Sequence, residues 1–237
     1  MGYTHDCRPE IFASQPAPVQ VNYLGYPGTM GADYIDYIIV DPIVAPIEHA
    51  DSYGEKLVHL PNCYQPNDRK RTRSPREFNR QECGLPRDAF AFCCFNNQYK
   101  ITEQMFSLWM DLLRVVPSAS AISGARQPSW VFCLIALSLR PIFLQNFIWR
   151  VCRWPTCFWT PSPTIRIRHS DALWAGVPVL TCLGETFAGR VAGSLLNAIG
   201  LPGLVTRSLA EYSAKRFIYR KIRTSSLPCG RSWRRTG

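Results

Sequence analysis

Short apolar runs separated by polar turns open the chain, a pattern typical of strands joined by loops. Three of these runs are rich in β-branched and aromatic residues and predict strands at 19–25, 36–41 and 56–61. LGYPGTMGA, residues 24–32, joins the first two and carries three glycines. This turn lacks the strand–GxGxxG–helix context of a dinucleotide site, so its spacing alone favours a plain connection.

The middle of the chain contains half of a strand–helix–strand unit. AFAFCCF, residues 89–95, is continuously apolar and predicts a strand buried on both faces of a parallel sheet. Thr102 predicts the N-cap of a following helix. The apolar residues of that helix recur at helical spacing: Met105, Phe106, Trp109, Leu112, Leu113 and Val116. Ligands of open α/β sheets gather outside the carboxyl ends of strands, where we expect Asn96, Asn97 and Lys100.

A second strand–helix pattern lies at 170–205. Ser170 predicts the N-cap of a short helix, and VPVLTC at 177–182 predicts a buried strand. LGET then turns into a helix from about Thr186, which stops at Gly200. Such a strand–turn–helix presents backbone N–H groups and a positive dipole end to a phosphate, although many α/β proteins share the turn without using it.

Composition places the chain among folded proteins with one large or two small domains. It has 237 residues, of which 46% are hydrophobic and 12% aromatic. No charged segment followed by an apolar core stands at the start, so a signal peptide is not predicted. The ten cysteines are irregularly spaced, which favours reduced thiols and a cytoplasmic setting. Four histidines and no CxxC pair argue against structural zinc.

The net charge of +10 is concentrated in two segments. Residues 118–169 hold six arginines, residues 213–237 hold eight lysines and arginines, and neither segment has an acidic residue. The other 160 residues carry a net charge of −4. A third polar and basic stretch, 65–80, is poor in apolar residues and predicts a linker between domains.

Four stretches in order carry a resemblance to a known family: RPEIFASQPAPVQVNYLGYPGTMGADYIDYIIVDP, EKLVHLPNCYQPNDRKR, FNNQYKI and DALWAGVPVLTCLGETFAGRVAGSLL. Together they resemble the catalytic region of the Spindly-like O-linked N-acetylglucosamine transferases, in its bacterial form, over residues 1–117 and 170–212. The resemblance implies an α/β fold of the GT-B type with two Rossmann-like domains. It also implies an inverting, metal-independent transfer of GlcNAc from UDP-GlcNAc to Ser or Thr of proteins, normally behind tetratricopeptide repeats.

The resemblance implies how the chain divides. Residues 1–64 correspond to the end of the first Rossmann domain and 65–80 to the linker. Residues 81–212 correspond to the second, nucleotide-sugar-binding domain, interrupted by 118–169, and 213–237 form a basic tail outside it. We expect the family's catalytic residues to lie upstream of Met1, so none is assigned in this chain.

The resemblance also implies donor-binding residues one position at a time. Leu24 and Gly25 would lie against the donor sugar. Asn97 would lie near the donor and Lys100 on its phosphates, where a charge-assisted contact stabilises the UDP leaving group. Asp171 falls where the family contacts the ribose. IRIRH stands at 165–169 in place of the family's diphosphate-gripping residues, and no role is carried onto that histidine. No metal or further cofactor is implied.

Three hypotheses compete for 118–169. Residues 130–149 have the length of a membrane span, but Arg140, Pro141 and two amides near the middle are costly in a bilayer. Interleaved arginines and aromatics could bind single-stranded nucleic acid. The third hypothesis is translation out of frame, because shifted codons convert the segment before Ser170 into a family-like strand and loop, with alanine forced at Trp154–Pro155. We favour it for 144–169, and with weaker support for 213–237.

The prediction for function is therefore a fragment of a protein O-GlcNAc transferase with little or no activity of its own. Its partners would be UDP-GlcNAc and an acceptor protein, with no nucleic acid and no membrane. The alternative is a non-catalytic basic module that binds nucleic acid or acidic membrane through 213–237.

Overall fold

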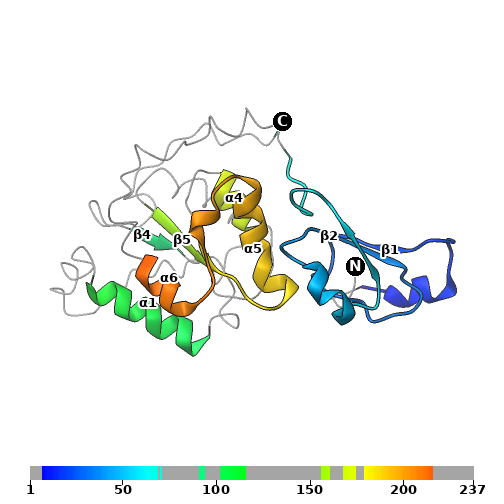
Figure 1. Cartoon of the computed structure of the whole chain (residues 1–237), viewed down its shortest axis with the longest axis horizontal. Helices are drawn as coiled ribbons and strands as arrows, with labels where there is room; N and C mark the ends of the chain where they lie inside the picture. Colours follow the sequence, from blue (N-terminus) through cyan, green and yellow to red (C-terminus); the bar gives the residue numbers. More distant parts are fainter. Residues whose placement is uncertain are drawn as a thin grey trace. The chain divides into compact units, whose positions relative to one another are not determined.

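The computed structural model describes residues 7–68, 70, 91–93, 102–115, 156–160, 168–174 and 179–215. These residues form two compact units (Figure 1). The described part of the first unit is 7–68 together with 183–202, and the remaining described residues belong to the second. The predicted division at 65–80 places 183–202 with the second domain, whereas this segment packs within the first unit.

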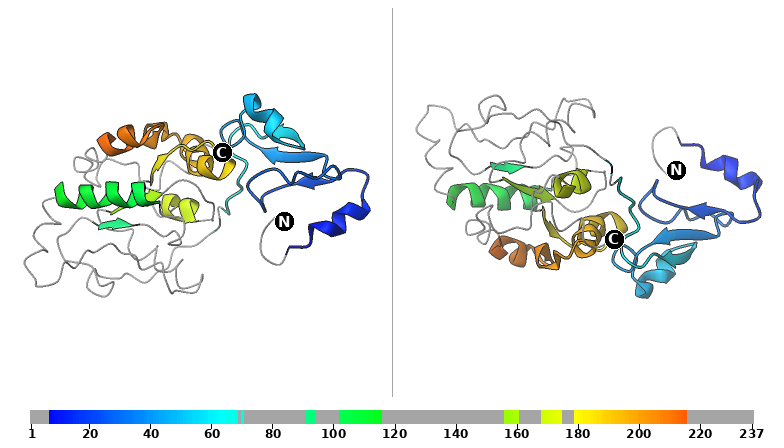
Figure 2. Two further views of the ribbon diagram at one scale, coloured as in Figure 1. Left: turned by 90° about the horizontal axis from the view of Figure 1, so that it is seen from below. Right: turned by 90° about the horizontal axis from the view of Figure 1, so that it is seen from above.

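The first unit is built on a three-stranded parallel sheet. Its strands are β1 (Val21–Asn22), β2 (Tyr37–Val40) and β3 (Lys56–His59), in that order across the sheet. Each lies inside a run that predicts a strand, so all three predictions are confirmed, with shorter bounds. The 3-10 helices η1 (Pro9–Ser14) and η2 (Ile47–Ser52) flank this sheet, with η2 beside β3 (Figure 2).

The helix α5 (Phe187–Ala198) completes the first unit. Its N-cap is Thr186, whose hydroxyl accepts a hydrogen bond from the Gly189 N–H at 3.2 Å. Its end is set by Gly200, which has a φ of +74°, while the Leu201 N–H donates to the Leu196 carbonyl at 2.8 Å. The start and the stop predicted from the sequence are both confirmed.

The second unit contains a four-stranded parallel sheet in the order β4 (Ala91–Cys93), β5 (Thr156–Thr160), β6 (Val179–Cys182) and β7 (Val205–Thr206). Helices α1 (Glu103–Val115) and α6 (Leu209–Lys215) lie on one side of β4 and β5, and α4 (Arg168–Trp174) lies on the other (Figure 1). The short helix η6 (Pro202–Leu204) precedes β7. Parallel strands covered by helices on both faces confirm the predicted α/β class.

In α1 the predicted N-cap is confirmed, but one of the apolar residues predicted to face the core is exposed. Thr102 accepts a hydrogen bond from the Met105 N–H at 3.3 Å, which confirms the N-cap. Met105 and Trp109 are buried, one turn apart on the same stripe. Phe106 is 45% exposed because it lies about 100° around the helix from that stripe.

The strand β5 lies within 118–169, the segment expected to interrupt the second domain, and belongs to the second sheet. Residues 156–160, TCFWT, pair in parallel with β4 through Phe92 and Cys157 and with β6 through Phe158 and Val179. Threonines and aromatic residues favour a pleated strand whatever the origin of the surrounding sequence. Most of 118–169, including the candidate span 130–149, lies outside the described residues. Within the described ranges, no helix is long and apolar enough to cross a membrane.

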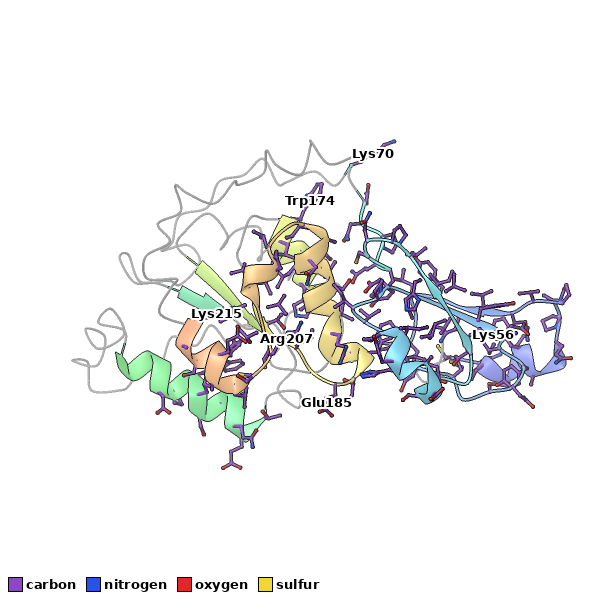
Figure 3. All side chains as sticks on the ribbon, viewed as in Figure 1. Lys56, Lys70, Trp174, Glu185, Arg207 and Lys215 are labelled. Carbon is purple, nitrogen blue, oxygen red and sulfur yellow. The ribbon has the colours of Figure 1, made fainter. Side chains whose placement is uncertain are left out.

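Two smaller boundaries also differ from prediction. Ser170 is the third residue of α4 and not its N-cap, because the helix begins at Arg168. The helix α6 runs to Lys215, past the predicted start of the basic tail at 213. Lys215, labelled in Figure 3, is the last residue of this helix, and its ammonium lies 2.7 Å from the Glu211 carboxylate one turn earlier. Residues 216–237 of the tail lie outside the described ranges.

Candidate functional site

The two donor-binding residues predicted in the first unit share one tight turn. The Gly25 N–H donates to the Tyr23 carbonyl at 2.8 Å, which closes a three-residue γ-turn around Leu24. Leu24 has a φ of +63° and its residue surface is 46% exposed. A non-glycine residue in the left-handed region costs on the order of 1–3 kcal/mol and persists only where its surroundings fix it. Leu24 and Gly25 are therefore held in a strained turn that faces solvent.

Hydrogen bonds on both sides of this turn fix its ends. The buried Asn22 amide donates from Nδ2 to the Gly28 carbonyl at 3.3 Å, which closes the segment on itself. The Tyr23 hydroxyl donates to the Tyr64 carbonyl at 2.9 Å, beyond the end of β3. Burial, followed by the nearby Cys63, raises the pKa of Tyr23, so its hydroxyl keeps the proton that it donates.

A buried glutamate holds the next part of the same loop. Glu55 is only 4% exposed, and its Oε2 accepts a hydrogen bond from the Thr29 hydroxyl at 2.6 Å. Its Oε1 accepts from the Met30 N–H at 2.7 Å. The Thr29 oxygen in turn accepts from the N–H groups of Gly31 and Gly54, at 3.0 and 3.1 Å. We call Glu55, Thr29 and Met30 the Glu55 clamp.

A second buried carboxylate, Asp41, lies directly after β2 and joins three segments of the unit. It has no exposed surface. Its Oδ1 accepts from the N–H groups of Ile43 and Val44, at 2.9 and 3.0 Å. Its Oδ2 accepts from the Tyr64 N–H at 2.9 Å and from the Ser194 hydroxyl at 2.6 Å. Because Ser194 belongs to α5, this carboxylate ties the helix to the sheet.

Sulfur and aromatic groups surround Asp41. The Cys63 Sγ lies 3.3 Å from the Ser194 oxygen, and burial raises the pKa of this thiol. The ring of Tyr64 meets the ring of Phe187 edge to face, with centroids 5.1 Å apart. Burial also raises the pKa of Tyr64. These contacts explain why 183–202 packs within the first unit.

The motif GETFAGR forms the predicted strand-to-helix turn between β6 and α5. Glu185, labelled in Figure 3, lies in this turn. Arg190 reaches back from the first turns of the helix, and its Nε donates to the Gly184 carbonyl at 3.0 Å. Its Nη1 donates to the Ile43 carbonyl at 3.4 Å. The arginine therefore fixes the turn against the segment that follows Asp41.

The other three predicted donor-binding residues do not lie in the described part of the first unit. Asp171 lies in the second unit, in the first turn of α4, where it is buried together with His169 and Ser170. Asn97 and Lys100 lie outside the described residues. The structure thus brings Leu24 and Gly25 into one turn, and the roles of Asn97, Lys100 and Asp171 stay predictions.

Sequence reasoning missed the two buried carboxylates. Asp41 ends an apolar strand and precedes Pro42, and Glu55 directly precedes β3. An acidic residue next to a buried strand is a weak signal, because its partners Ser194 and Thr29 lie far away in the sequence. Only the tertiary structure identifies them.

A match to a protein-family model shows to which family the chain belongs. The model for Glycosyl transferase family 41 matches residues 1–75, 73–128 and 152–222. The chain belongs to this family. The match is wider than the predicted coverage of 1–117 and 170–212, which is therefore too narrow. Since it includes 152–169, that segment shares residue preferences with the family, and the out-of-frame origin of 144–169 stays a prediction.

The individual proteins that this chain resembles carry names of glycosyltransferases, in agreement with the family match. The chain is 38% identical over 238 residues to a probable UDP-N-acetylglucosamine–peptide N-acetylglucosaminyltransferase SEC of Arabidopsis thaliana, covering 90% of this chain and 24% of the relative. It is 29% identical over 234 residues to a probable SPINDLY enzyme of the same description from Solanum lycopersicum, covering 89% and 24%. The chain spans about a quarter of the length of these relatives.

A solved structure gives the same result for the fold. A mutant O-GlcNAc transferase of Thermobaculum terrenum superimposes with a TM-score of 0.61 at 26% identity, covering 88% of this chain and 42% of the other. The resemblance to the Spindly-like transferases and the mixed α/β fold of the GT-B type are thereby confirmed.

Proposed function

We propose that this chain is part of a protein O-GlcNAc transferase that moves GlcNAc from UDP-GlcNAc to Ser or Thr of an acceptor protein. The curated relatives SEC and SPINDLY carry the name of this peptide N-acetylglucosaminyltransferase activity. The observation that carries the proposal is the turn of Tyr23 to Gly25, because Leu24, one of the two residues implied to contact the donor sugar, has left-handed backbone with a φ of +63° and is bonded into this turn with Gly25. Strained backbone is commonly found where a ligand is gripped.

The chemistry assigns a role to each predicted residue. Transfer with inversion breaks the bond between the sugar and UDP, and negative charge develops on the diphosphate. The Lys100 ammonium would compensate that charge without a metal ion. Asn97 would orient the donor, Asp171 would bind the ribose, and Leu24 with Gly25 would fix the position of the sugar.

Calorimetric titration of the protein with UDP-GlcNAc, UDP and GDP-mannose tests this proposal. We expect both uridine nucleotides to bind and GDP-mannose not to bind. Lys100→Ala should weaken both uridine nucleotides by roughly 10- to 100-fold, because a hydrogen bond to a charged group contributes about 1.5–3 kcal/mol. Lys70→Ala is the matched control for loss of one exposed lysine and should change neither affinity. Equal binding of GDP-mannose would reject the proposal.

The catalytic prediction is tested separately. A transfer assay with labelled GlcNAc and a peptide acceptor tests our prediction that this chain alone has little or no activity, and clear transfer would contradict it. No observation in the described residues favours the alternative of a polyanion-binding tail, and a cytoplasmic location stays a prediction. The coding DNA tests the out-of-frame origin, which is rejected if no single-base insertions or deletions near 118–169 restore the family reading frame.

A further inference from the structure

The Glu55 clamp uses the full hydrogen-bonding capacity of one hydroxyl. The Thr29 hydroxyl has one proton, which it donates to Glu55. It has two lone pairs, and these accept from the N–H groups of Gly31 and Gly54. The clamp lies at the amino end of β3, just before Lys56, which is labelled in Figure 3. It therefore has a fixed donor and acceptor order.

This order requires a carboxylate at position 55. Two donors, the Thr29 hydroxyl and the Met30 N–H, point at two different oxygens of Glu55. A glutamine has only one oxygen, so its NH₂ group would face either the Met30 N–H or a threonine oxygen whose lone pairs are both occupied. Glu55→Gln consequently breaks the clamp, although the two side chains have nearly the same shape.

The clamp supports the strained turn through the loop that joins them. Thr29 directly follows Gly28, and the Gly28 carbonyl accepts the hydrogen bond that closes the turn segment from Asn22. On the other side, Tyr23 is tied to Tyr64. The left-handed conformation of Leu24 persists only while both sides are fixed. Release of Thr29 frees one of the two sides.

We propose that Glu55 and Thr29 are positioning residues for the donor sugar. They do not touch the donor; they hold the turn of Tyr23 to Gly25 in the conformation that contacts N-acetylglucosamine. The proposal rests on the proposed function, from which the contact of Leu24 and Gly25 with the sugar is taken. It predicts a loss of affinity for UDP-GlcNAc that is not shared by UDP, because UDP lacks the sugar.

The test compares three variants in the full chain. Thr29→Val replaces the hydroxyl with a methyl of the same shape, Glu55→Gln replaces one acceptor oxygen with a donor NH₂, and Thr29→Ser keeps the hydroxyl as the conservative control. We expect Thr29→Val and Glu55→Gln to weaken UDP-GlcNAc binding roughly 5- to 10-fold, as loss of one hydrogen bond does, with UDP binding unchanged. Thr29→Ser should retain wild-type affinity for both ligands.

Hydrogen exchange at the Met30 amide supplies a readout that needs no ligand. Exchange should accelerate in Glu55→Ala, because this N–H loses its side-chain acceptor. Faster exchange with unchanged UDP-GlcNAc affinity overturns the inference, as does unchanged exchange or an equal loss of both ligands. If the wild-type chain binds neither nucleotide, the proposed function itself fails. Wild-type binding that survives Thr29→Val unaltered rejects the positioning role alone.

Discussion

Two buried carboxylates of the first unit, Asp41 and Glu55, are built alike and connect very different parts of the chain. Each accepts a hydroxyl and a backbone N–H beside a strand of the same sheet. The hydroxyl on Asp41 comes from Ser194, 153 residues away, whereas the hydroxyl on Glu55 comes from Thr29, 26 residues away. The first carboxylate joins a helix to the sheet, and the second shapes a loop beside an exposed turn. Stability should therefore depend on Asp41 and ligand geometry on Glu55.

The largest expected effect is the loss of stability in Asp41→Ala. The change leaves four buried or partly buried donors without their acceptor, so the free energy of unfolding should fall by about 4 kcal/mol or more, since each unsatisfied buried group costs about 1–3 kcal/mol. Urea denaturation followed by circular dichroism measures it. The exposed Asp33→Ala is the control and should stay within about 0.5 kcal/mol of wild type. Similar values for both variants would contradict the central role of Asp41.

A matched pair of hydroxyl deletions compares the two carboxylates directly. Ser194→Ala should cost about 1–2 kcal/mol of stability, because the Asp41 oxygen that it leaves is completely buried. Thr29→Val should cost a similar amount, about 1–2 kcal/mol, because it leaves the buried Glu55 Oε2 without its hydroxyl donor, although the Gly31 and Gly54 N–H groups that it also releases are exposed to water. The same denaturation measurement compares the two variants with Asp41→Ala. A cost for Thr29→Val as large as that for Asp41→Ala would contradict the comparison.

The strain at Leu24 is tested by two truncations that differ only in backbone freedom. Leu24→Gly and Leu24→Ala both remove the side chain, but only glycine adopts a φ of +63° without a steric penalty. Relief of about 1–2 kcal/mol in the left-handed conformation, less the entropy of glycine, should make Leu24→Gly more stable by roughly 0.5–1 kcal/mol. Equal stability of the two variants would show that the turn is not strained in solution.

Local patterns predicted much of the fold, because the signals that start and stop elements are themselves local. The cap Thr102, the helix start near Thr186 and the stop at Gly200 depend on neighbours within a few residues, and all three are confirmed. The grouping of α5 with the first unit could not be predicted, because it depends on contacts made by Ser194 and Phe187 with residues more than 120 positions earlier.

The candidate site shows the same limit. The resemblance located Leu24 and Gly25, since their motif is contiguous, and the structure brings them into one turn. Glu55 and Thr29 carry no motif, and their relation exists only after the loop folds back onto the start of β3. For β5, the sequence led us to favour an out-of-frame origin for 144–169, although the threonines and aromatic residues within TCFWT at 156–160 are types that favour a strand.

The smallest expected effect is alkaline destabilisation around Asp41. Burial raises the pKa of Cys63 above the ordinary thiol value of 9.0, and the pKa of Tyr64 rises above 10.0 for the same reason. A group whose pKa is higher in the folded state contributes stability that is complete below its unfolded pKa and is lost as the pH rises through its folded pKa. The free energy of unfolding should therefore fall between about pH 9 and pH 10, where the unfolded thiol titrates before the tyrosine. Cys63→Ala should reduce this fall in the free energy of unfolding, which is measured by urea denaturation at pH 7.5, 9 and 10. If the free energy of unfolding of Cys63→Ala falls as steeply with pH as that of the wild type, groups other than Cys63 cause the alkaline loss of stability.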